Sequence, residues 1–147
     1  MTTTIVTVIE GKDRMTQHQV RTIETVIERP LDEAYAFAQH PENFPKWASG
    51  LSTSLHREGD GWRAERPAGE ALVRFSEPNA LGVLDHWVDL PDQPQIYIPL
   101  RMIAQGNATV VSLTLLRQPS MSDDDFERDA DHVARDLAAL KALLEKT

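Results

Sequence analysis

The C-terminal segment most constrains the fold, because it has the pattern of one long amphipathic helix. Ser122 and the three aspartates that follow it are typical of a helix start. Apolar side chains then recur every three or four positions over roughly six turns. They are Phe126, Ala130, Val133, Ala134, Leu137, Leu140 and Leu144. A single apolar face of this length needs a broad apolar surface to cover it, so the rest of the chain has to supply a sheet.

Most of the preceding chain has strand patterns. Residues 20–28 alternate apolar and polar side chains, with β-branched residues at most apolar positions. Turn residues divide the later part into short segments, and each consecutive pair should form an antiparallel hairpin. These predicted strands are residues 51–58, 62–66, 70–76, 83–90, 95–105 and 108–117. The sequence therefore predicts one strand, an interruption, and a six-strand meander.

The interruption is the stretch RPLDEAYAFAQHPENFPKW, residues 29–47. Pro30 has no N–H and a fixed φ, so it ends strand pairing and suits the start of a helix. The pattern predicts a short helix up to the break at His40 and Pro41, followed by a second helical turn around residues 42–44. Two short, bent helices should thus follow the first strand.

This order of elements resembles the helix-grip fold of the START-related SRPBCC superfamily. Residues 27–47 are similar to the family's strand, proline, helix and "Asp-Pro-Glu-x-x-Pro-x-Trp" signature, with His40 where an aspartate is common. The resemblance covers residues 20–145 and implies an α+β fold in which a curved antiparallel sheet wraps around the long C-terminal helix. It also implies a cavity between sheet and helix. Members include carriers, cyclases, hydroxylase subunits and co-chaperones, so the resemblance specifies fold better than activity.

Strand alternation indicates which side chains would face such a cavity. In residues 83–90, His86 shares a face with three apolar residues, whereas Asp85 and Asp89 share the opposite face. Two carboxylates are costly in an apolar cavity, so His86 is expected on the cavity side. The full set of predicted ligand-binding residues is Trp47, Trp62, Phe75, His86, Ile98, Leu100, Met102, Val133 and Leu137.

His86 is the candidate for chemistry. An imidazole in an apolar pocket could orient a ligand carbonyl or hydroxyl, or act as acid or base in an aldol-type cyclisation. The alternative is a structural histidine hydrogen-bonded at the rim. Tyr97 and Arg101 are expected on the outer face, with Arg101 paired across strands to Asp85 or to glutamate-bearing neighbours, although a one-residue slip of register would turn both into the pocket as an anion or enolate anchor. The histidines show no metal-ligand spacing, and no metal or cofactor is predicted.

Charge limits the partners. With 15 Lys and Arg against 23 Asp and Glu, the net charge of −8 disfavours nucleic acid, and no apolar run is long enough for membrane insertion. We expect a cytoplasmic protein that binds a small hydrophobic or aromatic molecule, of the polyketide cyclase-like kind; whether it also catalyses a reaction is left open. The alternatives are a non-catalytic lipid or small-molecule carrier, and a co-chaperone or partner-binding module that uses the acidic exterior.

The first 19 residues are predicted to be an extension of a single domain formed by residues 20–147. TIVTVIEG at residues 4–11 nearly repeats TIETVIER at residues 22–29, and both have strand composition. The superfamily core does not require the first copy. We therefore expect an additional strand at residues 3–10, either at a sheet edge or as the contact of a homodimer.

Overall fold

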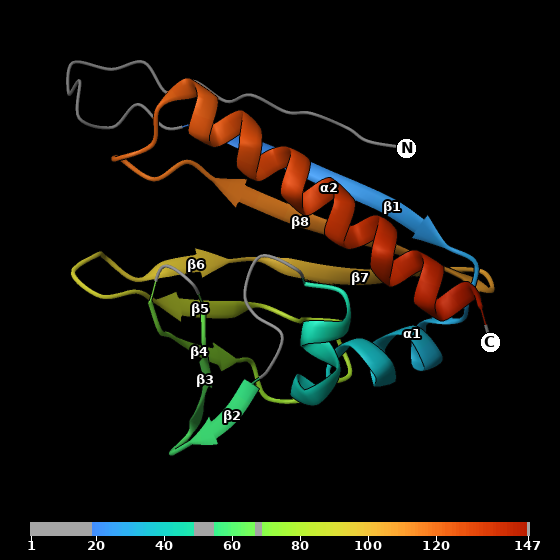
Figure 1. Ribbon diagram of the computed structural model, residues 1–147. Coiled ribbons are helices and arrows are strands. Elements are labelled where there is room, and N and C mark those ends of the chain that lie inside the picture. The colour runs from blue at the N-terminus through green and yellow to red at the C-terminus, as the bar shows by residue number, and fades with distance from the viewer. Residues whose placement is uncertain (1–18, 49–54, 67–68, 147) are drawn as a thin grey trace.

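The computed structural model describes residues 19–48, 55–66 and 69–146. Within them, one long helix lies along a surface of antiparallel strands, and two short helices close one end (Figure 1). The elements are β1 (Val20–Ile27), α1 (Leu31–Ala38), the 3-10 helix η2 (Pro41–Lys46), β2 (Leu55–Glu58), β3 (Gly61–Ala64), β4 (Ala71–Phe75), β5 (His86–Asp89), β6 (Ile96–Ile98), β7 (Leu100–Gln105), β8 (Ala108–Leu116) and α2 (Asp123–Glu145). The predicted α+β helix-grip architecture is confirmed.

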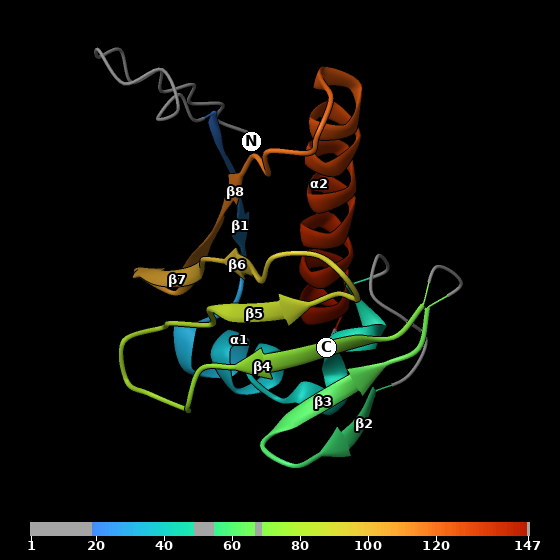
Figure 2. The ribbon, with the colours of Figure 1, turned by 90° about the vertical axis from the view of Figure 1, so that its left-hand side faces the viewer.

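The strands form two sheets, where the sequence predicts one meander. The order is β1-β8-β7 in one sheet and β2-β3-β4-β5-β6 in the other, with every pair antiparallel. The expected single strand over residues 95–105 is wrong: Pro99 divides it, because proline cannot donate a ladder hydrogen bond. Its carbonyl still accepts from Thr114 N at 3.0 Å. Figure 2 shows the consequence, since β1 and β8 run steeply while β3, β4 and β5 cross the view. The strand surface is therefore strongly bent.

The strand predicted over residues 83–90 is shortened to β5, because the chain before it is held by side chains. Asn79 Oδ1 accepts from the backbone N–H groups of Leu81 and Val83 at 2.9 and 3.1 Å. Gly82 and Leu84 then pair with β7 through Met102 N to Gly82 O and Leu84 N to Leu100 O, both 2.8 Å. This segment links the two sheets just before His86.

Helix α2 has the start and the apolar face that the sequence predicts. Ser122 Oγ accepts from Asp125 N at 3.0 Å, and the Asp125 carboxylate accepts from Ser122 N at 3.2 Å, which completes a capping box. Near the other end, Lys141 Nζ donates to Val26 O at 2.6 Å. The buried residues of the helix are Phe126, Ala130, Leu137, Leu140 and Leu144. This face covers β1 and β8 and forms the main core with them.

The two short helices are also found where the sequence predicts them, but the second is longer than predicted. Helix α1 begins directly after Pro30, and η2 runs over Pro41–Lys46, longer than the turn expected around residues 42–44. Phe44 and Trp47 at its end are buried. In the described ranges, no helix is long and apolar enough to cross a membrane. The strand expected at residues 3–10 lies outside the described residues.

Candidate functional site

A cavity of about 590 Å³ lies between the first half of α2 and the bent strand surface. Helix α2 lines it only as far as Leu137, and β5, β6 and β8 provide the facing walls. The apolar part of the lining is Phe44, Trp47, Ala48, Val88, Leu90, Ile96, Ile98, Leu113, Leu115, Leu116, Met121, Val133 and Leu137. The predicted location of the cavity, between sheet and helix, agrees with this lining.

The remaining lining is polar. Most of its members come from the first turns of α2 and from the segment before that helix. They are Arg66, His86, Gln93, Tyr97, Thr114, Gln118, Ser120, Asp125, Arg128, Asp129, His132 and Asp136. Burial raises the pKa of the Asp129 carboxyl above its usual range. The cavity thus combines apolar walls with acidic and basic side chains on one helix.

Strand register places His86 on the cavity side. Phe75 pairs with His86, and His86 pairs with Ile98, so these three side chains form one row on the same face. Trp87 lies on the opposite face, where its ring stacks on Tyr97 with centroids 5.4 Å apart. The strand register is therefore the expected one. Arg101 and the Tyr97 hydroxyl both bond Asp85, although Tyr97 also contributes to the cavity lining.

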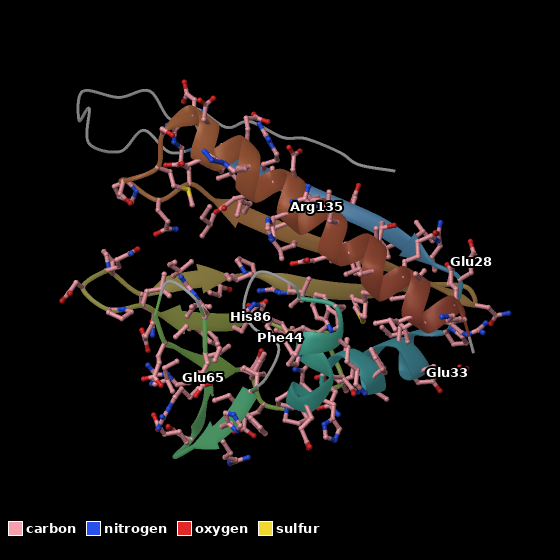
Figure 3. All side chains as sticks on the ribbon, in the orientation of Figure 1. Glu28, Glu33, Phe44, Glu65, His86 and Arg135 are labelled. Atoms are coloured by element: carbon pink, nitrogen blue, oxygen red, sulfur yellow. The ribbon has the colours of Figure 1, made fainter. Side chains whose placement is uncertain are left out.

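The His86 ring is only 3% exposed and packs among aromatic rings. Its centroid lies 5.2 Å from Phe44, edge to face, and 5.7 Å from Phe75 (Figure 3). Nδ1 lies 3.2 Å from Leu84 O. Burial lowers the pKa of the imidazole to about 4, although the hydrogen bond to Leu84 and the charge of Asp85 act in the opposite direction. His86 is therefore neutral at physiological pH.

Trp47 forms part of the same wall. Its indole packs edge to face against the Phe44 ring, with ring centroids 5.1 Å apart, and the residue is 4% exposed. The indole Nε1–H is buried and has no hydrogen-bond partner in the part of the chain that the structure describes. Trp47 and His86 thus both pack against Phe44, and both also line a small second hollow.

On the outer face, the Asp85 carboxylate is enclosed by donors. It accepts from the Tyr97 hydroxyl at 2.6 Å, from Leu100 N at 3.0 Å, and from Arg101 Nε and Nη2 at 2.9 and 2.8 Å. Burial alone would raise the pKa of Asp85, but these hydrogen bonds outweigh it and hold the pKa at about 2. The predicted Arg101–Asp85 pair is confirmed, with a carboxylate that is buried where a surface pair was expected.

The structure brings five of the nine predicted ligand-binding residues to the cavity wall. They are Trp47, His86, Ile98, Val133 and Leu137. Leu100 and Met102 do not line the main cavity: the turn at Pro99 puts them in the other sheet from Ile98, where they pack in the main core, and Leu100 lines the small hollow. Phe75 lies against His86, at the small hollow.

Trp62 does not line the main cavity either, for a different reason. It pairs with Val73, and Val73 pairs with Val88, so Trp62 shares the cavity-side face but lies two strands beyond the wall. There the Arg57 guanidinium lies over its ring at 5.7 Å. Alternation alone gave the correct face and could not give the distance from the cavity.

The polar side chains of α2 at the cavity were missed. Asp125, Asp129, His132 and Asp136 recur at the helical spacing and flank the apolar stripe of the same helix. This second stripe was the available signal. Within the described residues, no group of three or more His, Asp or Glu side chains could hold a metal ion.

Comparison with solved structures defines the class of fold. XoxI from Bacillus cereus superposes with a TM-score of 0.69 at 13% identity, over 85% of this chain and 94% of that one. A START superfamily protein from Mycobacterium smegmatis gives 0.66 at 11% identity, over 88% and 98%. CalU16 from Micromonospora echinospora gives 0.65 at 13% identity, over 96% and 83%. No protein-family model and no curated protein matches the sequence.

These likenesses, together with the sheet order and the long C-terminal helix, show that the chain has a START-like helix-grip fold. At such low identities they establish the fold alone, so the function has to be argued from the cavity.

Proposed function

We propose that this protein binds a small hydrophobic or aromatic molecule in the cavity between α2 and the sheets. The observation that carries the proposal is the cavity itself, of about 590 Å³, with apolar walls on the strands and a polar side that comes largely from α2. Its size falls within the roughly 300–1,000 Å³ of small-molecule sites. An aromatic ligand would replace water against Trp47, Phe44 and the leucines of β8, which is the source of hydrophobic binding energy.

The polyketide cyclase-like resemblance of residues 27–47 leaves binding and catalysis as two versions of this function. Catalysis would need a second polar group to converge with His86 on one ligand atom. Arg101 and the Tyr97 hydroxyl, which are the obvious partners in sequence, are both committed to Asp85 on the outer face. The geometry therefore supports binding, as in a carrier, more directly than acid–base turnover.

Titration with Nile red, a neutral dye whose fluorescence rises in apolar surroundings, tests the proposal. Val133→Phe places extra volume in the cavity wall and should weaken dye binding at least tenfold. The matched control is Ile103→Phe, because Ile103 is an apolar residue on β7 that is 61% exposed and does not line the cavity. It should bind the dye like the wild type.

Dye binding that is absent in the wild type, or equally strong in both variants, would contradict a ligand site in this cavity. A partner-binding module acting through the acidic exterior would then become the leading alternative.

A further inference from the structure

One polar group at the cavity, the indole Nε1–H of Trp47, is buried without a hydrogen-bond partner among the residues that the structure describes, and the imidazole of His86 can complement it. Both residues line the main cavity and the small second hollow. Buried polar groups are nearly always hydrogen-bonded, so each such exception calls for an explanation. A ligand that supplies the missing bonds is one.

The role of His86 follows from its contact with the backbone. A carbonyl oxygen can only accept, so the 3.2 Å contact to Leu84 O requires that Nδ1 carries the proton. A neutral imidazole has one N–H, and Nε2 is therefore an acceptor. Nε2 has no hydrogen-bond partner among the residues that the structure describes. The low pKa of about 4 independently keeps the ring neutral.

The role of Trp47 is fixed by its chemistry. An indole Nε1–H can only donate, and this one is buried without an acceptor. Trp47 is held edge-on against Phe44 at 5.1 Å, and the same phenylalanine holds His86 at 5.2 Å. Among the described residues, the cavity wall therefore has a donor on Trp47 and an acceptor on His86 that bond no protein group, and both rings pack against Phe44.

We propose that the cavity selects apolar molecules that carry a hydroxyl group, which accepts from Trp47 Nε1 and donates to His86 Nε2 through one oxygen or two neighbouring ones. A hydroxyl is a neutral group that accepts and donates through a single oxygen. The inference rests on the proposed ligand-binding function and names the class of ligand, a phenol or an alcohol with an apolar body.

Other ligand classes fit less well. An ether or ketone can satisfy Trp47 but leaves His86 Nε2 without a donor, and a hydrocarbon satisfies neither group. A carboxylate would set its charge against the Nε2 lone pair. The cavity lining also carries three carboxylates, Asp125, Asp129 and Asp136, against the two guanidinium groups of Arg66 and Arg128. Together with the net charge of −8, this disfavours anionic ligands.

Displacement of Nile red by four matched compounds tests the inference on the wild-type protein. They are 2-naphthol, 2-methoxynaphthalene, naphthalene and 2-naphthoate. We expect 2-naphthol to bind about five- to tenfold more tightly than 2-methoxynaphthalene, the difference that one hydrogen bond makes. Naphthalene should follow, and 2-naphthoate should bind most weakly.

Variants then assign the preference to the two side chains. His86→Phe keeps the ring and removes the acceptor, while Trp47→Phe keeps an aromatic ring and removes the donor. In each variant, the ratio of the dissociation constants of naphthalene and 2-naphthol should fall to about the square root of its wild-type value or lower. The matched control is Val133→Ala, which trims an apolar part of the wall. It should weaken all three neutral compounds by a similar factor and keep their ratios.

Long-range ¹H–¹⁵N NMR spectra of the wild-type imidazole keep the inference testable even if a variant does not fold. They should show a protonated Nδ1 and an unprotonated Nε2. The ¹⁵N resonance of Nε2 should shift when 2-naphthol is added and hardly shift when 2-methoxynaphthalene is added. Equal affinities for these two compounds, or a protonated Nε2, would overturn the inference while leaving the cavity as a ligand site. If Nile red itself does not bind, the proposed function fails, and this inference fails with it.

Discussion

The Asp85 carboxylate and the Arg101 guanidinium form a two-pronged ion pair across the junction of the two sheets, at 2.9 and 2.8 Å. Asp85 directly precedes His86, and it also accepts from Leu100 N at 3.0 Å, next to the break at Pro99. The pair therefore fixes the point where the strand surface bends, and this bend positions His86 at the cavity.

Loss of the Arg101 guanidinium should destabilise the protein more than loss of a similar surface pair. Arg101→Leu leaves a buried carboxylate with fewer partners, and we expect a decrease of about 1–3 kcal/mol in the free energy of unfolding. Arg74→Leu is the control, because Arg74 bonds Asp89 at 3.0 Å on the same outer face.

The two arginine side chains are similarly exposed, 49% and 45%, whereas the carboxylates differ, 7% for Asp85 and 35% for Asp89. Arg74→Leu should therefore cost about 0–1 kcal/mol. Equal losses in urea unfolding would show that burial of Asp85 does not set the strength of the pair.

Acid should destabilise the protein through His86. Its pKa is about 4 in the folded protein and roughly 6.5 in an unfolded chain, so the unfolded state binds the proton more readily. The contribution of His86 to the free energy of unfolding is fully present above about pH 6.5. It falls as the pH drops towards 4, by on the order of 3 kcal/mol. His86→Phe should flatten this part of the stability profile.

The pH window separates His86 from Asp85. Asp85 has a lowered pKa of about 2, so its contribution is lost only below about pH 4. His56→Phe serves as a control, since it replaces an exposed histidine on β2 and should keep the wild-type slope. A wild-type profile that is flat between about pH 6.5 and 4 would argue against a buried, neutral His86.

Leu137→Ala should destabilise the protein by about 2–5 kcal/mol, the range for large-to-small changes in a core. Leu137 is 2% exposed and packs in the main core of α2 and the strands. Leu81→Ala is the matched control, since Leu81 is 80% exposed, and a change below about 0.5 kcal/mol is expected there. Chemical denaturation of both variants measures the difference, and a loss at Leu137 as small as that at Leu81 would be inconsistent with the packing.

Deletion of residues 1–14 should leave cooperative unfolding intact. Strand β1 begins at Val20, and its eight residues pair in register with β8, so the pairing of β1 in the described sheet does not depend on residues 1–14. The predicted role of the N-terminal segment is self-association, which gel filtration of the shortened chain can measure. Loss of the cooperative unfolding transition in the shortened chain would instead show that the segment belongs to the core. The homodimer stays a prediction.

The sequence alone determined the elements whose signals are local. The capped amphipathic pattern of residues 122–144 predicted α2, Pro30 predicted the change from β1 to α1, and alternation predicted that His86 and Asp85 lie on opposite faces. Each of these depends on the period of side chains or on the chemistry of one proline, which a short window of sequence contains.

Only the tertiary structure decided which inward-facing residues meet at the cavity. Trp62, Leu100 and Met102 have the alternation of cavity residues, yet Trp62 lies two strands away and the other two belong to the core beyond Pro99. Their distances depend on how the strand surface bends and on where α2 lies across it. Those relations join residues far apart in the chain, such as Asp85 with Arg101 and Phe44 with His86, through packing that no local pattern encodes.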